Sequence, residues 1–110
     1  MTTNYKLTDQ NMCTRRVYQW VLGEWHETSG AGDLCGPGWL HCYESPLLAV
    51  LRNPGDAAIQ TPRLFLCECE GAEKIEALKR GYSRMRIVKE MPLPKITLEQ
   101  CVIFAIHCAV

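Results

Sequence analysis

The sequence predicts an α+β fold in which two or three short helices pack on a small antiparallel sheet. Residues 63–70 and 82–90 alternate apolar and polar side chains with the period of a strand. Ser45-Pro46 is typical of a helix start, because serine caps free amide groups and proline gives up a donor that would have no partner. Thr97 and Gln100 form a capping-box pattern ahead of an apolar segment.

The N-terminal third has the composition of short strands. Asn4–Leu7 and Arg16–Val21 carry β-branched and aromatic residues, and Gly23-Glu24-Trp25-His26 is typical of the return of a hairpin. Thr28–Gly38 holds four glycines and a proline, and it lacks the spacing of the phosphate-binding fingerprints. We expect a loop with a tight turn at Gly36 or Gly38 that needs positive φ.

The middle of the chain predicts a helix and then a strand. The helix runs over Leu47–Arg52 and ends at Asn53-Pro54-Gly55, since the residue before proline disfavours helical backbone. In the strand Arg63–Glu70, alternation places one face in the core, and that face carries Phe65, Cys67 and Cys69.

Two further helices are expected in the C-terminal third. Ala72–Arg80 has helix-favouring residues closed by Gly81, and a strand follows over Tyr82–Glu90, until Pro92 and Pro94. The last helix begins at Thr97 and is apolar almost all round, which indicates burial against the sheet or a partner chain.

Composition narrows the class of protein. The 110 residues suit one domain spanning 1–110, and Lys+Arg and Asp+Glu are both 12, so the formal net charge is zero. A neutral chain has no overall field to attract a polyanion, which argues against nucleic-acid binding. The basic stretch is read as a solvated face; it consists of Lys79, Arg80, Arg84, Arg86 and Lys89.

The seven cysteines are an odd number, so they cannot all pair within the chain. The first residues lack the pattern of a secretory signal, and no segment reaches the ~18 apolar residues of a membrane span. We therefore expect reduced thiols, a cytoplasmic location and no membrane partner.

Zinc is the first cofactor that this many cysteines suggest, but no close Cys-x-x-Cys pair is present, and no cofactor is expected. A small zinc-stabilised domain stays an alternative, with Cys35, His41 and Cys42 as the ligands. Cys67 and Cys69 are read as small core hydrophobes. Cys42 beside His41 is a weak catalytic pattern, because neighbours on a strand point to opposite faces.

An enzyme alternative comes from a resemblance. His26-Glu27-Thr28, then Gly38-Trp39, then His41-Cys42-Tyr43 and a helix resemble the order of small ADP-ribosyltransferase-like folds. The resemblance implies NAD binding and a catalytic set of His26, His41 and Tyr43. The acidic residue is left open among Glu68, Glu90 and Glu99.

A second resemblance covers roughly residues 4–104. Leu34–Leu48, Arg63–Gly71 and Ile96–Gln100 together resemble a family of small uncharacterised phage and prophage domains, with Leu40 inserted between Trp39 and His41. That family implies an origin and a fold, and it brings no activity with it.

The preferred interpretation is a phage-type accessory or anti-defence protein that binds a host or viral protein in the host cytoplasm, with no catalytic residues. Aromatic side chains anchor interfaces, and Trp20, Trp25, Trp39 and Tyr43 are expected to be exposed. The binding set is Trp25, Trp39, His41 and Tyr43. A homodimer through the C-terminal helix would bury Val102, Ile103, Phe104 and Ile106.

Overall fold

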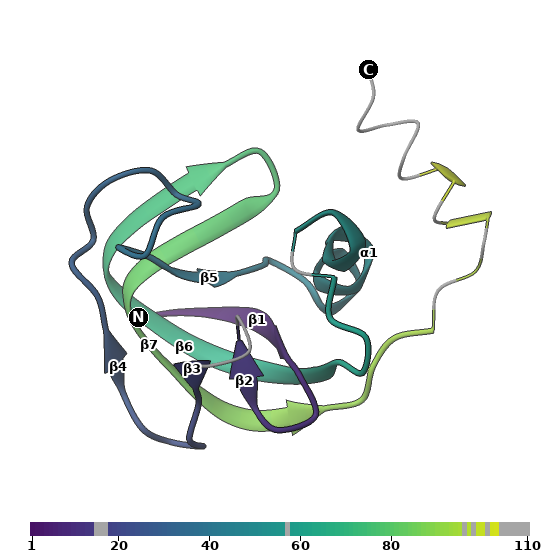
Figure 1. The fold of residues 1–110 in the computed structure, drawn as a ribbon, viewed down its shortest axis with the longest axis horizontal. Coiled ribbons are helices and arrows are strands. Elements are labelled where there is room, and N and C mark those ends of the chain that lie inside the picture. Colours follow the sequence, from purple (N-terminus) through teal and green to yellow (C-terminus); the bar gives the residue numbers. More distant parts are fainter. Residues whose placement is uncertain (15–17, 57, 96, 98, 101, 104–110) are drawn as a thin grey trace.

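The computed structural model describes residues 1–14, 18–56, 58–95, 97, 99–100 and 102–103. A long hairpin of two strands curves through the molecule, shorter strands run beside it, and one helix lies to the side (Figure 1). The elements are β1 (Thr2–Thr8), β2 (Cys13–Thr14), β3 (Tyr18–Gln19), β4 (His26–Glu27), β5 (Leu40–Cys42), α1 (Pro46–Asp56), β6 (Arg63–Glu76) and β7 (Lys79–Met91).

The main sheet is antiparallel and folds back on itself. β6 lies between β1 and β7, and the other edge of β7 pairs with β4 and with β5. Just after β5 the chain meets β1, where Tyr5 and Tyr43 exchange two backbone hydrogen bonds of 2.8 Å. The sheet therefore has an enclosed inner face and an outer face.

Each face has its own hydrophobic cluster. The outer cluster lies under α1, where Leu7, Leu64 and Met91 face one another across three strands and Tyr43 and Ala49 pack over them. The inner cluster is larger and nearly free of charge; it consists of Trp20, Leu40, Cys42, Phe65, Cys67, Cys69, Tyr82, Met85 and Ile87. The predicted core face of residues 63–70 is confirmed, and so is the shared side of Met85 and Ile87.

The predicted α+β class with two or three helices is wrong, since the described part is mostly strand with one short helix. The error lies mainly in Ala72–Arg80, which continues β6, turns at Ala77-Leu78 and begins β7. Helix propensity is a weak preference, and the hydrogen bonds that a neighbouring strand offers outweigh it. Here Glu73 pairs with Tyr82 and Ile75 with Arg80.

The start of α1 is confirmed by the hydrogen bond from the Leu48 amide to Ser45 Oγ, at 3.1 Å. Its end is four residues later than predicted, at Asp56. The reversal is made instead by Asn53, whose carbonyl accepts from the Ala58 amide and whose side chain makes two 2.9 Å bonds with the backbone of Ile59.

The capping box is also confirmed. The Thr97 amide donates to Gln100 Oε1 at 2.8 Å, and the Gln100 amide donates to Thr97 Oγ1 at 3.1 Å. Val102 and Ile103 are about half exposed, and Figure 1 shows this segment extending away from the sheet. Phe104–Val110, and Arg16 and Val17 of the predicted second strand, lie outside the described residues.

The loop before β5 differs from the prediction in its turn. Positive φ occurs at Gly30 and Gly32, not at Gly36 or Gly38, and Gly38 packs instead against the carbonyl of Ala31.

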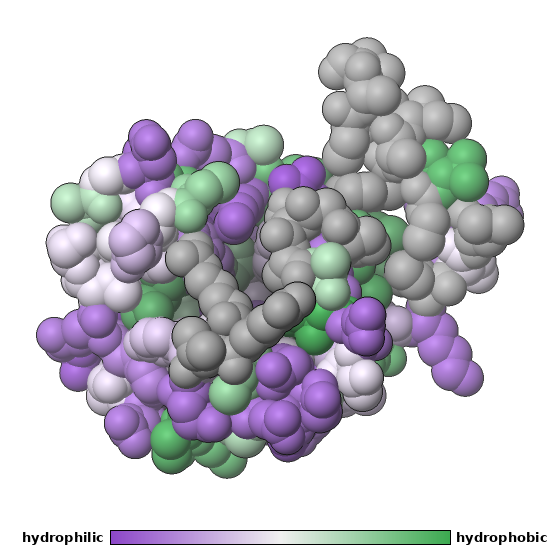
Figure 2. Space-filling view, viewed as in Figure 1, coloured by the Kyte–Doolittle hydropathy of each residue, from purple (hydrophilic) through white to green (hydrophobic). Residues whose placement is uncertain are grey.

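No helix in the described ranges is long and apolar enough to cross a membrane. Among the coloured atoms of Figure 2, hydrophilic side chains predominate, and the apolar ones form small separate areas.

Gly71 sits where β6 has an irregularity in its pairing with β7, with φ +84°, and a Cβ there would lie 2.2 Å from Ser83 Oγ. Gly23 has a similar φ of +81° with open space around it. We expect Gly23→Ala to lower the free energy of unfolding by about 1–2 kcal/mol through backbone strain alone. Gly71→Ala should cost about 0.5–1.5 kcal/mol more, because Ser83 Oγ must rotate away and give up the hydrogen bond that it accepts from the Ala72 amide. Equal losses in urea unfolding would contradict this account of the irregularity.

Candidate functional site

A hollow of about 760 Å³ opens between the end of β1, β5 and α1. Its walls mix polar, apolar and cationic side chains. They are Lys6, Leu7, Asp9, Gln10, Cys13, Thr14, Cys35, His41, Tyr43, Ala49, Asn53, Ala58, Ile59, Gln60 and Lys79. Two of the four predicted binding residues, His41 and Tyr43, are therefore part of one concave surface.

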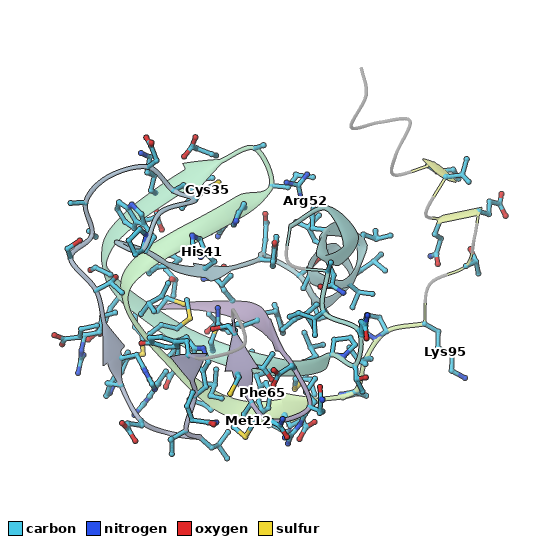
Figure 3. The ribbon with its side chains drawn as sticks, viewed as in Figure 1. Met12, Cys35, His41, Arg52, Phe65 and Lys95 are labelled. Atoms are coloured by element: carbon cyan, nitrogen blue, oxygen red, sulfur yellow. The ribbon has the colours of Figure 1, made fainter. Side chains whose placement is uncertain are left out.

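Alternation along β5 decides what faces this hollow. His41 points towards it, with its Nε2 hydrogen-bonded to the carbonyl of Leu34, while Leu40 and Cys42 are buried on the other side. Cys35 also lines the hollow, and Figure 3 shows Cys35 and His41 in the same part of the molecule. The alternative zinc set of Cys35, His41 and Cys42 is therefore not brought together in this structure.

The expectation of exposed aromatic anchors is wrong for three of the four residues. Trp20 is 1% exposed, and Trp39 and Tyr43 are each 8% exposed. The indole of Trp39 donates to the Gly32 carbonyl at 3.0 Å, so this side chain orders the glycine-rich loop. Trp25 is half-buried beneath the guanidinium groups of Arg84 and Arg86, which lie 4.0 and 4.7 Å from its ring centre.

Those two arginines belong to a ladder of charges on the outer face of the sheet. Arg84 bonds Glu27 and Glu70, and Arg86 bonds Glu68. The basic stretch is thus neutralised at these positions by neighbouring strands. Glu90 is bound to Arg63 at 2.6 Å, which lowers the pKa of the Glu90 carboxyl. Two of the three acidic candidates for catalysis, Glu68 and Glu90, are therefore already paired.

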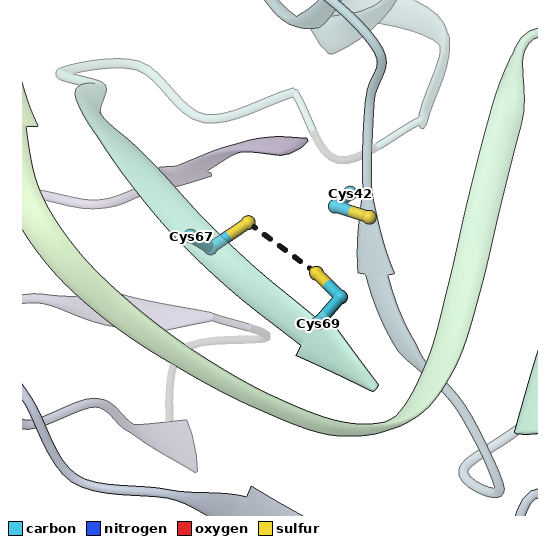
Figure 4. Close-up of side chains that lie close together, drawn as sticks. All are labelled: Cys42, Cys67 and Cys69. Carbon is cyan, nitrogen blue, oxygen red and sulfur yellow. Dashed lines mark hydrogen bonds between the residues drawn. The ribbon is translucent and has the colours of Figure 1, made fainter. Parts of the chain in front are cut away.

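Three cysteines meet on the inner face. The Sγ atoms of Cys42, Cys67 and Cys69 all lie within 4.8 Å of one another, and each residue is completely buried. Figure 4 shows Cys42 on β5 facing the other two on β6, whose sulfur atoms are 3.8 Å apart. The sequence prediction found the shared face of Cys67 and Cys69 but treated them as apolar filling. Nothing local in the sequence brings Cys42 to them, because that contact depends on sheet closure.

Two buried polar side chains accompany this cluster. Asn4 is fully buried and pairs across the sheet with Cys67. Lys6 is 7% exposed, lies over the Trp20 ring, and donates through Nζ to the His41 carbonyl at 2.6 Å. Burial lowers the pKa of Lys6, and the charges of the three cysteines act in the opposite direction.

The thiols themselves are unequal. Hydrogen bonds to Cys67 and Cys69, together with burial, raise the pKa of Cys42. Hydrogen bonds from Cys42 and Cys67, with a further one from Asn4, lower the pKa of Cys69. Negative charge in the cluster is therefore best held on Cys69, with the other two thiols as donors.

His26 is separate from the hollow. Its ring packs against Trp20 in a tilted arrangement, with 4.3 Å between centroids, and its Nδ1 lies 3.0 Å from the hydroxyl of Tyr18. It is not among the residues that line the concave surface with His41 and Tyr43. The three residues of the ADP-ribosyltransferase-like set therefore do not surround one space in this structure.

With this geometry in hand, comparison with known proteins gives one match. A family model described as a domain of unknown function, DUF7666, matches residues 2–99. The chain belongs to the DUF7666 family. No curated protein and no solved structure matches this domain. The hollow and the cysteine cluster both lie within the DUF7666 domain, so both belong to its fold and not to an appended segment.

The burial of His26 has a consequence for stability against pH. Burial against Trp20 lowers its pKa, with Lys6 acting in the same direction and Glu24 opposing. The unfolded chain then takes up this proton near pH 6.5 and the folded chain only at lower pH. We expect stability to be fully present above about pH 6.5 and to fall as the pH drops through the folded pKa.

The measurement is the thermal midpoint by circular dichroism at pH 7.5, 6.5 and 5.5. His26→Phe retains an aromatic ring for Trp20 and cannot titrate, while the other two histidines are the same in both chains. The midpoint of the variant should therefore fall less on acidification. The same pH slope in both chains would sink this assignment.

Proposed function

We propose that this DUF7666 domain is a phage-type accessory or anti-defence protein that acts by binding a host or viral protein in the host cytoplasm. The partner would insert a short segment into the hollow between β1, β5 and α1. The phage part is supported by the resemblance of residues 34–48 and their following strand to small phage domains. The binding part is supported by the hollow itself.

The volume and chemistry of the hollow suit a peptide segment. At about 760 Å³ it is within the usual range of ligand sites and is large enough for a few side chains. Tyr43, Leu7 and Ile59 offer apolar contact, and the amides of Gln10 and Gln60 offer hydrogen bonds at the rim. This mixture is typical of an interface with a polar edge around an apolar centre.

The carboxylate and the histidine in the same walls are already held by backbone groups. Asp9 is the one carboxylate among the described lining residues, and its Oδ1 already accepts from the amides of Asn11 and Cys13 at 2.9 Å. His41 is held by the Leu34 carbonyl. A general acid and base would need matched carboxylates or a carboxylate and a histidine in reach of each other. We therefore favour binding over the NAD-dependent alternative.

A photo-crosslinking experiment tests the location and the class of partner together. A photoreactive amino acid is placed at Gln10 or Gln60 on the rim of the hollow, and at Glu76 on the β6–β7 hairpin as a matched exposed control. In bacterial lysate, with and without phage infection, we expect the two rim positions to capture the same protein. Glu76 should not capture it.

The identified partner then allows a quantitative test. Gln60→Trp fills the hollow and should weaken binding at least about tenfold, whereas Glu76→Trp should leave it unchanged. Capture from Glu76 alone, or equal effects of the two tryptophans, would remove the hollow as the binding surface. A rise in thermal midpoint with NAD that is lost in Tyr43→Phe or His41→Gln would favour the enzyme instead.

A further inference from the structure

The inner face of the sheet carries a closed triangle of sulfur atoms that the proposed binding surface does not use. Cys67 and Cys69 alternate on β6, so their side chains project on the same side of the strand. Cys42 comes from β5 and closes the triangle from the opposite side (Figure 4). All three sulfur atoms lie within 4.8 Å of one another, and the 3.8 Å between Cys67 and Cys69 is the separation of two thiolates that each lie about 2.3 Å from one metal ion.

The charge around the triangle is the second observation. Lys6 is almost fully buried, and burying an ammonium group is unfavourable unless a negative charge offsets it. Its ammonium lies on the inner face, over the Trp20 ring, and none of the described carboxylates forms an ion pair with it. Thiolates held by a metal ion would give this buried lysine a counter-charge on its own face of the sheet.

We propose that Cys42, Cys67 and Cys69 bind a single thiophilic d¹⁰ metal ion, with Lys6 as a buried counter-charge to the thiolates. Binding releases thiol protons to solvent, because thiolate is the ligating form. Asn4 and Lys6 are the outer groups that orient and neutralise the sulfur atoms, as carboxylates and carbonyls do around other metal sites.

The number of ligands selects among such ions. In the described part of the chain no fourth cysteine, histidine or carboxylate joins the triangle. Structural zinc is almost always held by four ligands, whereas soft thiolate sets without a fourth ligand suit Cu(I). We therefore expect Cu(I) to bind more tightly than Zn(II). Because the triangle is completely buried, the ion should enter during folding and not by diffusion into the folded chain.

The full chain is reduced, unfolded and refolded without oxygen in the presence of one equivalent of Cu(I), of Zn(II), or of neither. Affinity is measured by competition with a colorimetric chelator, and thiol protection is mapped by alkylation and mass spectrometry. We expect one ion per chain. In urea that exposes the core, Cys42, Cys67 and Cys69 should react more slowly with metal than without it, while Cys13 and Cys35 react equally in both cases. Zinc uptake with the same protected residues would also support the site.

Variants distinguish a metal-binding site from cysteines that only fill the core. Cys69→Ala should weaken metal binding by about 100-fold or more, and Cys13→Ala, a matched variant outside the triangle, should leave it unchanged. Lys6→Met should weaken metal binding by about 10–100-fold. If Cys69→Ala does not fold, the alkylation map of the unaltered chain decides. Uptake of neither ion, or protection of other cysteines, would overturn the proposal.

Discussion

The two backbone hydrogen bonds between Tyr5 and Tyr43 are the contact that closes the sheet and positions both candidate sites. They attach the end of β5 to β1 while β5 itself pairs with β7, so the four strands enclose a common interior. Without this bridge, β5 would be held at one edge only, and an edge strand of three residues has few hydrogen bonds of its own. The bridge therefore places the sequence from 40 to 46, and with it both candidate sites.

This closure makes β5 a wall between two environments. Cys42 projects into the dry interior towards the sulfur atoms of β6, and His41 projects into the hollow. Lys6 connects the two sides, because it is buried among the inner residues and donates to the backbone carbonyl of His41. Lys6 thus links the charge state of the buried interior to the position of the β5 backbone, which forms a wall of the hollow.

The elements that sequence reasoning predicted well are those specified locally. Alternation in 63–70, the Ser45 cap and the reciprocal bonds of Thr97 and Gln100 need only neighbouring residues. The hairpin over 72–80 was missed because Ala77-Leu78 lacks an Asn-Gly or Asp-Gly signal, although Ala77 adopts φ +51°. The burial of Trp20 and Trp39, and the approach of Cys42 to Cys69, depend on partners far away in the chain and leave no local pattern.

An outer charge ladder and an inner sulfur triangle use opposite faces of the same hairpin. On the outer face, Arg84 and Arg86 are paired with glutamates on adjacent strands and remain partly exposed, where each ion pair contributes little to stability. On the inner face burial lowers the pKa of the one ammonium, Lys6, and the three thiols beside it act in the opposite direction. We therefore expect chemistry that depends on shifted thiol or ammonium pKa values at the cysteine cluster inside this fold. We expect recognition of a partner at the hollow, where a polar rim and an apolar floor meet solvent.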